Sequence, residues 1–301
     1  METVICNNCG CPDTLPLHKF RLDQESQDSW VVQCLRCGLV YLNPRPTRER
    51  IGIYYPPNYQ ASMLSLLARG KTNLIARLGF GIIRRRRTPS AQGVRLLDVG
   101  CSNGAYLAAM REKGWDVEGV EFNRDAVDYA RNSRQLKVTH GDVEQVLGQL
   151  AGNNFDVVTM WHVLEHAFDP AAALQQIRRV LKPRGIVMLE VPNYASPLAS
   201  LFKSYWFPLD IPRHLYQFTP STLKTMLAKA GFHRIRVNGV PSPEAMVWSA
   251  VAARQSSPID FNRGDVLKLN PLAMTLAFPL SWIMAQFTMS DNMAAIAVRA
   301  D

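Results

Sequence analysis

The sequence predicts an α/β protein whose core is a doubly wound, seven-stranded sheet, with a small cysteine-rich ribbon before it and an apolar helical insert before the last strand. Strand-like and helix-like segments alternate from Val94 to about Asn193, the first strand runs into a glycine-rich loop, and paired cysteines stand near the N-terminus. We therefore expect a ribbon over residues 1–45, a linker with basic amphipathic helices over 46–92, and the main domain over 93–301.

Composition and charge narrow the class of protein. The 301 residues are 47% hydrophobic, which is ordinary for a folded globular chain and argues against disorder. The formal net charge is +9, and part of the excess lies in the run from Arg84 to Arg87, which is either a solvated linker or a contact for nucleic acid, anionic lipid or a phosphorylated substrate. No secretory signal is evident, so we expect a cytoplasmic, reducing environment in which paired cysteines bind metal.

Two C-x2-C-G pairs supply four candidate metal ligands, Cys6 and Cys9 in CNNCG and Cys34 and Cys37 in CLRCG. Two residues between cysteines let both thiolates reach one ion, and four thiolates in tetrahedral geometry suit zinc. The interval between the pairs accommodates a hairpin of HKFRL with SWVVQC. We predict a structural zinc ribbon, because a four-cysteine site leaves no open position for substrate. A redox pair is the alternative, and Cys11 has the wrong spacing to be a ligand.

The glycine-rich loop follows the apolar strand predicted over Val94–Val99 and precedes a helix. Its spacing, Gly100-x-Ser102-x-Gly104, lacks the third glycine of a dinucleotide-phosphate loop. Glycines let the backbone pass close to a ligand, and the helix N-terminus presents free amides. With Asp98 at the end of the strand, this loop fits a cofactor that carries a cationic amino-acid end.

The remaining elements follow in order along the chain. DVEGVEFN predicts a second strand that ends in Glu121, an acidic residue placed to accept hydrogen bonds from ribose hydroxyls. KVTHGDVEQV predicts a third strand followed by Asp142, and FDVVTMWHVLEH predicts a fourth. The helix ALQQIRRVLKPRG is closed by Pro183 and Gly185, and GIVMLEVPN, GFHRIRVNGV and MAAIAVRA predict the last three strands.

These motifs resemble those of class I S-adenosylmethionine-dependent methyltransferases, which have a Rossmann-like fold. The resemblance covers roughly residues 93–239 and the last strand, and Ser102 stands where a glycine is more usual. It implies S-adenosylmethionine as the cofactor, with Asp142 in contact with the adenine amino group. The residues that we expect to bind the cofactor are Asp98, Gly100, Ser102, Gly104, Glu121, Phe122, Asp142, Val143 and Trp161.

A cluster of titratable residues, His162, Glu165 and His166, lies at the end of the predicted fourth strand. Ligands of such sheets lie beyond the carboxyl ends of the strands, so we expect the cluster near the methyl group of the cofactor. His214 and Tyr216 follow in RHLYQF. We predict that these five residues supply a general base or orient the acceptor, with His162 and His214 favoured as catalytic and Glu165 and His166 capping or orienting. A divalent metal and a purely structural role are the alternatives.

Two kinds of methyltransferase are similar to this arrangement. Ubiquinone-pathway O-methyltransferases and small-RNA 2′-O-methyltransferases carry E-x-x-E-H at the position of His162 to His166. In those enzymes this motif and a later histidine together hold a divalent metal. This chain has H-x-x-E-H, which favours softer ions such as zinc. Zinc ribbons joined to such a core through a segment like CGLVYLNPRP recur in methyltransferases of polysaccharide and deoxysugar pathways, where a histidine and a tyrosine act as base or orient the acceptor.

The stretch from Asn270 to Ser290 contains no charged residue. Its length approaches that of a membrane span, but Pro279 interrupts it, so we expect a buried or interface-lying helix pair in an insert over 241–292. The insert would form an apolar lid or lie peripherally on a membrane, and a homodimer interface or plain core is the alternative.

The sequence thus predicts transfer of a methyl group from S-adenosylmethionine to a small or lipid-linked acceptor, by preference a glycan or secondary-metabolite hydroxyl, with histidine-assisted deprotonation. The alternative is RNA methylation, with the zinc ribbon and the Arg run as the contact to nucleic acid. The basic residues lack interleaved aromatic residues, which disfavours a nucleic-acid partner.

Overall fold

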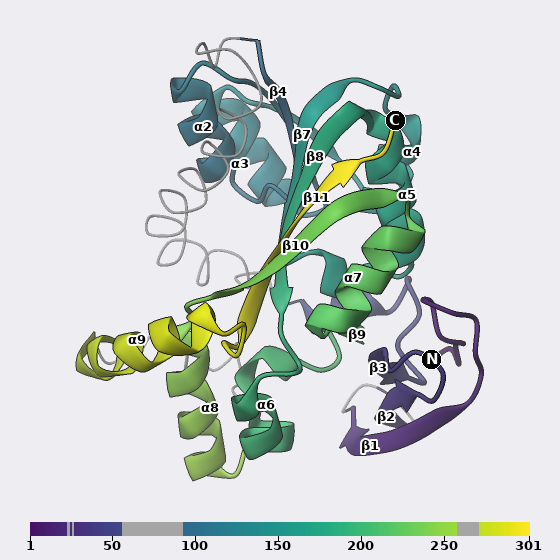
Figure 1. Ribbon diagram of the computed structural model, residues 1–301, viewed down its shortest axis with the longest axis vertical. Coiled ribbons are helices and arrows are strands. Elements are labelled where there is room, and N and C mark those ends of the chain that lie inside the picture. The colour runs from purple at the N-terminus through teal and green to yellow at the C-terminus, as the bar shows by residue number, and fades with distance from the viewer. Residues whose placement is uncertain (23–24, 26, 56–92, 258–270) are drawn as a thin grey trace.

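The computed structural model describes residues 1–22, 25, 27–55, 93–257 and 271–301 (Figure 1). The predicted basic helices and the run from Arg84 to Arg87 lie outside the described residues.

The core is a mostly parallel, seven-stranded sheet with the strand order β10-β11-β8-β7-β4-β5-β6. Its first three strands along the chain, β4, β5 and β6, pair in parallel, and β7 and β8 extend the parallel part on the other side of β4. Strand β11 runs antiparallel to both of its neighbours. The seven strands predicted from the sequence are confirmed, and they are Arg95–Val99 (β4), Asp116–Glu121 (β5), Lys137–His140 (β6), Phe155–Trp161 (β7), Leu181–Pro192 (β8), Phe232–Val240 (β10) and Asn292–Arg299 (β11).

Helices cover both faces of this sheet, as a doubly wound fold requires. Figure 1 shows α2 and α3 on one face and α4, α5 and α7 on the other. The central strand β7 is buried almost throughout, which explains why its sequence reads as a continuous apolar run. The covering helices are Ala105–Glu112 (α2), Arg124–Arg134 (α3), Val143–Gln149 (α4), Pro170–Val180 (α5) and Pro220–Lys229 (α7).

Polar side chains cap the N-termini of several of these helices. Asn123 accepts a hydrogen bond from Ala126 N at the start of α3, and Thr219 and Thr222 form a reciprocal capping box at the start of α7. Helix α5 ends at Val180, before the predicted boundary at Pro183 and Gly185, because the fully buried Leu181 already pairs with the neighbouring strand.

The N-terminal cysteine ribbon forms a second sheet, of order β1-β2-β3-β9. The predicted hairpin is present as β1 (Thr14–Arg21) and β2 (Asp28–Cys34), and β3 (Val40–Asn43) follows. The fourth strand, β9 (Tyr216–Gln217), comes from the segment between β8 and α7. Because a strand of the later chain completes the ribbon sheet, the ribbon and the core share one hydrophobic cluster.

Two helices lie between β10 and β11, where the sequence predicts the apolar insert. Helices α8 (Pro243–Gln255) and α9 (Pro271–Gln286) extend from one end of the sheet, and the short α6 (Pro197–Phe202) lies near them in Figure 1. Ser281 Oγ in α9 accepts a hydrogen bond from Ser242 N at the start of α8, with a distance of 2.6 Å. Among the described residues, no helix has both the length and the apolar character that crossing a membrane requires.

Candidate active site

The loop between β4 and α2 requires glycine at two positions. Gly100 and Gly104 have φ angles of +74° and +75°. A Cβ on Gly100 would lie 2.3 Å from Val163 Cγ2, and one on Gly104 would lie 2.4 Å from Leu136 Cδ1. Ser102 also adopts a positive φ, of 49°, which explains why glycine is the more usual residue there. The loop is therefore a tight, closely packed turn between β4 and α2.

Two acidic side chains lie beside this loop at the carboxyl ends of β4 and β5. Asp98 is buried and accepts a hydrogen bond of 2.7 Å from Thr159 Oγ1. Burial and the nearby charge of Glu121 together raise the pKa of Asp98 to about 7, although the hydrogen bond from Thr159 opposes the shift. The Glu121 carboxylate accepts hydrogen bonds from Ser102 N and Asn123 N, each at 2.8 Å. Glu121 is thus held against the glycine loop.

The other predicted cofactor contacts follow along the same edge of the sheet. Asp142 comes after β6 and caps α4, with its Oδ1 atom accepting from Glu144 N at 3.0 Å. Phe122, directly after β5, is 64% exposed. Trp161 ends β7 and meets the Tyr106 ring edge-on, with the ring centroids 5.7 Å apart. The structure therefore places these residues at the carboxyl ends of adjacent strands, where ligands of open α/β sheets bind.

His162, just beyond β7, lies between two buried carboxylates. Its Nδ1 atom is 3.2 Å from Glu165 Oε1, and its Nε2 atom is 3.0 Å from Glu190 Oε1. Two carboxylates accept hydrogen bonds from both ring nitrogens only when the imidazole is protonated. Neither nitrogen is then available to accept a proton from a substrate, so this geometry favours an orienting role for His162 over that of a general base.

Glu190 is a site residue that the motif comparison does not single out. It lies in β8, within GIVMLEVPN, and it is buried next to His162. A lone acidic residue in an otherwise apolar central strand is costly unless it is paired. That local irregularity is the sequence signal that points to Glu190.

Glu165, His166 and His214 form a second part of the cluster. One candidate ligand atom from each of the three lies within 4.8 Å of the others. The Nδ1 atom of His166 is 2.9 Å from Arg213 O, and that of His214 is 2.7 Å from Pro208 O. An Nδ1 proton donated to a carbonyl leaves Nε2 as the acceptor nitrogen of each ring.

The ionisation of His166 and Glu165 suits proton acceptance or metal binding. Burial lowers the pKa of His166 to about 4, and a proton on the neighbouring His214 would add to this effect, so His166 is neutral at physiological pH. Burial opposes ionisation of Glu165, but the hydrogen bond from His162 and the nearby histidines lower its pKa overall. Glu165 Oε2 is buried and has no hydrogen-bond partner among the described residues. A carboxylate oxygen without a partner beside two imidazoles that are held through Nδ1 fits the donor set of a divalent metal.

Tyr216 lies outside this cluster. Its hydroxyl accepts a hydrogen bond from Arg45 Nη1 at 3.1 Å and donates one to Phe168 O at 3.3 Å. Burial raises the pKa of Tyr216 to about 12. The structure thus brings His162, Glu165, His166 and His214 together. It places the Tyr216 hydroxyl apart from them, between Arg45 and Phe168, where the ribbon sheet meets the core. We call this contact region the ribbon junction.

The four predicted metal-binding cysteines converge at the end of the ribbon. Cys6 Sγ lies 3.4 Å from Cys37 Sγ, and Cys9 Sγ lies 3.5 Å from Cys34 Sγ. All four sulfurs lie within 4.8 Å of one another, and no disulfide joins any cysteine of the described chain. The buried Cys11 approaches Asp13 instead. Four sulfurs at this spacing suit a tetrahedral ion with metal–sulfur bonds of about 2.3 Å.

Known proteins resemble the chain in the part that carries the glycine loop and the acidic residues. A family model described as a methyltransferase domain matches residues 65–237. The chain belongs to this methyltransferase family. It is a class I S-adenosylmethionine-dependent methyltransferase, and the predictions of this enzyme class, of its cofactor and of a Rossmann-like sheet are confirmed.

Two curated relatives are named ubiquinone biosynthesis O-methyltransferase. The one from Idiomarina loihiensis is 31% identical over 175 residues, which cover 54% of this chain and 70% of the relative. The one from Psychrobacter arcticus is 33% identical over 162 residues, which cover 49% of this chain and 62% of the relative. Both alignments include about half of this methyltransferase.

Solved structures share the fold at lower identity. A methyltransferase from Archaeoglobus fulgidus that depends on S-adenosylmethionine superposes with a TM-score of 0.51 and 24% identity, over 77% of this chain and 96% of that one. Phosphoethanolamine N-methyltransferase 2 from Haemonchus contortus, in complex with S-adenosylmethionine, superposes with a TM-score of 0.55 and 18% identity, over 94% of this chain and 71% of that one. These likenesses show the fold of this methyltransferase.

Proposed function

We propose that this methyltransferase transfers the methyl group of S-adenosylmethionine to a hydroxyl of a small or lipid-linked acceptor. The observation that carries the proposal is the cluster of the buried Glu165 and His214 with the half-buried His166, which has an acceptor nitrogen on each ring. The cluster follows Val163, whose side chain packs against Gly100 of the glycine loop. A hydroxyl is a weak nucleophile until it loses its proton, and a neutral imidazole is the side chain suited to take that proton near neutral pH. The O-methyltransferase names of the two relatives support this choice of acceptor atom.

The cofactor would lie along the carboxyl ends of β4, β5 and β6. Ionised Asp98 would face the cationic amino group of the methionine end, Glu121 would accept from the ribose hydroxyls, and Asp142 would contact the adenine amino group. The exposed ring of Phe122 and the side chains of Val143 and Trp161 would line the adenosine. This order puts the methyl group at the end of the binding site nearest β7 and its histidines.

Proton transfer would then accompany methyl transfer. The acceptor oxygen would take the methyl group as the carbon–sulfur bond breaks, its proton would pass to the base, and S-adenosylhomocysteine would leave. His214 is our candidate for the base, because Pro208 O accepts the proton of its Nδ1 atom and so leaves its Nε2 atom to take a proton from the acceptor. His162, between Glu165 and Glu190, would orient that cluster.

The same three residues fit a divalent metal as the alternative activator of the hydroxyl. Glu165 through its unpartnered oxygen, and His166 and His214 through the nitrogens not bound to carbonyls, would hold the ion. Such an ion supplies Lewis-acid polarisation of a hydroxyl when it is bound. Two imidazoles with one carboxylate favour zinc or a similarly soft ion over magnesium.

A lipid-linked acceptor is supported by the surface of α9. Seven large apolar side chains in or directly after this helix are at least half exposed, and they are Leu272, Leu276, Phe278, Leu280, Trp282, Ile283 and Phe287. We propose that α9 lies in the interface of a membrane and gives the site access to an acceptor held there, with a homodimer interface as the alternative. We propose that the hydroxyl belongs to a glycan or a secondary metabolite. This is the class of acceptor implied by the resemblance to methyltransferases that carry a zinc ribbon.

Transfer of labelled methyl groups tests the proposed function. The enzyme is incubated with tritium-labelled S-adenosylmethionine and a cell extract, which is then fractionated into lipid, RNA and soluble pools. We expect label in the lipid or soluble small-molecule pool, and loss of that label with His214→Ala. Label in the RNA pool would establish the alternative, a nucleic-acid acceptor. Calorimetry with S-adenosylhomocysteine tests the cofactor site directly, and an absence of binding would overturn its assignment.

A further inference from the structure

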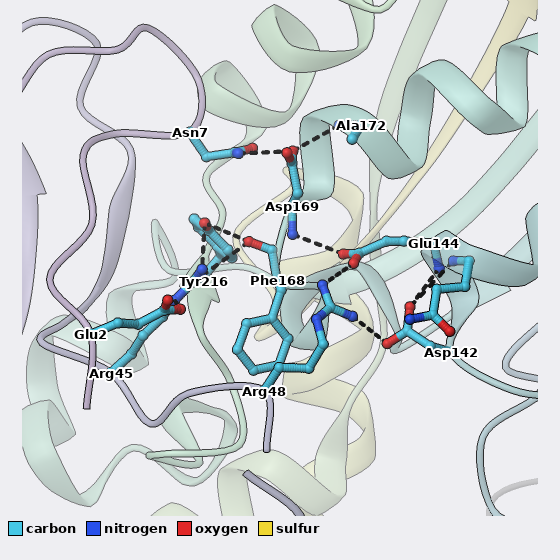
Figure 2. Close-up of polar contacts among 11 residues, drawn as sticks. Glu2, Asn7, Arg45, Arg48, Asp142, Glu144, Phe168, Asp169, Ala172 and Tyr216 are labelled. Carbon is cyan, nitrogen blue, oxygen red and sulfur yellow. Dashed lines mark hydrogen bonds and ion pairs between the residues drawn. The ribbon is translucent and has the colours of Figure 1, made fainter. Parts of the chain in front are cut away.

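Arg48 connects the segment after the ribbon to the proposed adenine site. Its guanidinium forms ion pairs with both Asp142 and Glu144 at the start of α4 (Figure 2). The same guanidinium lies over the Phe168 ring, 4.6 Å from the ring centroid. Asp142 therefore has its two carboxylate oxygens held from two sides, Oδ1 by the backbone of α4 and Oδ2 by Arg48.

The chain that carries Arg48 is anchored in turn by Arg45. This arginine is buried, and its Nε atom donates to Glu2 Oε1 at 2.8 Å. Its Nη1 atom donates to Phe168 O and to the Tyr216 hydroxyl, each at 3.1 Å. Figure 2 shows Arg45 and Arg48 both reaching Phe168. The position of Arg48 thus depends on contacts of the ribbon junction.

A second route connects the cysteine cluster itself to the same turn. Asn7 lies between Cys6 and Cys9, the first cysteine pair, and its Nδ2 atom donates to Asp169 Oδ1 at 2.9 Å. Asp169 N donates to Glu144 Oε1 at 2.8 Å, while Arg48 holds the other oxygen of that carboxylate. Asn7 Oδ1 also accepts from Ala171 N in the first turn of α5, at 2.9 Å. Both routes end at the turn from Asp142 to Glu144.

We infer that Arg48 is a positioning residue for the adenine end of the cofactor, and that it makes cofactor affinity depend on the metal state of the cysteine cluster. The inference rests on the proposed function, because it requires Asp142 to contact the adenine amino group. Without Arg48, two carboxylates close in sequence repel each other, and Oδ2 of Asp142 loses the cation that fixes its direction. A ribbon without its ion loses the order that holds Asn7 and Arg45, and the same turn loosens.

Calorimetric titration with S-adenosylhomocysteine tests the role of Arg48. We expect Arg48→Ala to weaken binding by about tenfold, which lies within the usual range for coupled sites, and Arg48→Lys to recover part of the loss. Arg50→Ala is the matched control, because Arg50 lies on the same segment and pairs with Glu25, 3.0 Å away. Wild-type affinity in Arg48→Ala would overturn the inference and leave the proposed function intact. Failure of the wild-type enzyme to bind would instead overturn the proposed function.

An analogue separates positioning of the adenine from a general loss of structure. S-inosylhomocysteine has an oxygen in place of the adenine amino group, so it lacks the donor that Asp142 would accept from. We expect the wild-type enzyme to prefer S-adenosylhomocysteine, and Arg48→Ala to reduce that preference. An equal loss for both ligands would show a merely structural role and would overturn the positioning role.

Zinc affinity supplies the reciprocal test. Coupling between two binding sites is symmetric, so a cofactor that binds more tightly to the metal-loaded protein must itself tighten zinc binding by the same factor. Zinc affinity is measured by competition with a chelator, with and without saturating S-adenosylhomocysteine. We expect the ligand to tighten zinc binding in the wild-type enzyme and to lose this effect in Arg48→Ala. Zinc affinity that is indifferent to the ligand, or a protein that binds no zinc, would overturn the coupling.

Discussion

The Nε2 atom of His162 lies 3.0 Å from the buried Glu190 Oε1, and this pair joins the end of β7 to β8. His162 also adopts a φ of 54°, an unusual backbone conformation for a residue other than glycine. Strained residues cluster at functional sites, where the surrounding structure holds them in place. The pair therefore fixes the imidazole against the cluster that we propose to activate the acceptor.

Glu190→Gln should slow methyl transfer and leave cofactor binding unchanged. Glutamine keeps a hydrogen-bonding group near His162 Nε2 but removes the charge that holds the imidazolium, and partners of this kind are worth about 10- to 100-fold in activity. Steady-state kinetics should show the loss in kcat, while calorimetry with S-adenosylhomocysteine should give the wild-type affinity. Glu112→Gln, on the exposed end of α2, is the control with no expected effect. A Glu190→Gln enzyme of normal kcat would show that the pair is only structural.

Cofactor affinity should rise with pH up to about 7. Burial raises the pKa of Asp98 to about 7 in the free protein, and a cationic amino group binds the ionised carboxylate. Below that pH, binding must release the Asp98 proton, so affinity should fall by up to about tenfold per pH unit. Calorimetry of S-adenosylhomocysteine from pH 5 to 8 should show this slope. In Asp98→Asn binding should be weaker, and its remaining pH dependence should be flat.

The same shift predicts the effect of Asp98 on the stability of the free protein. The folded protein keeps the Asp98 proton in a pH range where the unfolded chain, with the ordinary aspartate pKa of 3.8, has released it. The folded state therefore binds more protons, and the contribution of Asp98 to the free energy of unfolding declines as pH rises from about 4 to about 7. Thermal unfolding should show a smaller decline over this window in Asp98→Asn.

Gly100→Ala should destabilise the protein and abolish cofactor binding. Its φ of +74° costs about 1–3 kcal/mol for any residue with a Cβ, and the added carbon would lie 2.3 Å from Val163 Cγ2. Adding Val163→Ala should relieve the contact but not the backbone strain, and so recover part of the loss in denaturant unfolding. Gly148→Ala, on the exposed side of α4 with no atom near the new Cβ, should leave stability unchanged or raise it by about 0.5–1 kcal/mol.

The purified protein should contain about one zinc ion per chain, held by the four clustered cysteines. Cys37→Ser should lose that zinc, because three thiolates bind the ion far less tightly. Cys11→Ser is the matched control, since Cys11 follows Cys9 closely in the sequence but its thiol lies against Asp13. Elemental analysis by mass spectrometry measures the content. Equal zinc in wild type and Cys37→Ser would assign the metal to another site, such as the histidine cluster.

Vesicles of phosphatidylethanolamine and phosphatidylglycerol should bind the protein through α9. Leu276, 70% exposed, should contribute to this binding, and Leu276→Asp should lower the partition coefficient by at least about tenfold because a buried leucine is worth about 1.5–3 kcal/mol. Leu201→Asp is the control, since Leu201 is similarly exposed but lies on α6. Vesicle flotation measures the binding. Unchanged flotation, with a dimer in sedimentation equilibrium that Leu276→Asp dissociates, would favour the homodimer interface.

Local pattern was sufficient to predict much of the fold and the candidate cofactor site. The alternation of strands and helices, the loop from Gly100 to Gly104 and the acidic residues at the ends of β4 and β5 and after β6 all follow from short-range periodicity and spacing. The cysteine pairs that we predict to bind metal are likewise encoded by two-residue intervals, and their sulfurs do converge. Such features are readable because each depends on neighbours within a few positions of the chain.

What only the tertiary structure decided is which distant side chains meet. Glu190 in β8 reaches His162, and Tyr216 turns into the ribbon sheet instead of joining the histidines. Arg48 crosses from the ribbon junction to Asp142 at the start of α4. These contacts join residues far apart in the sequence, and they depend on strand order and on the packing of two sheets into one core. Local sequence periodicity contains no information about such contacts. The sequence by itself therefore determined the helices and strands, and the tertiary structure decided which side chains meet at the candidate site.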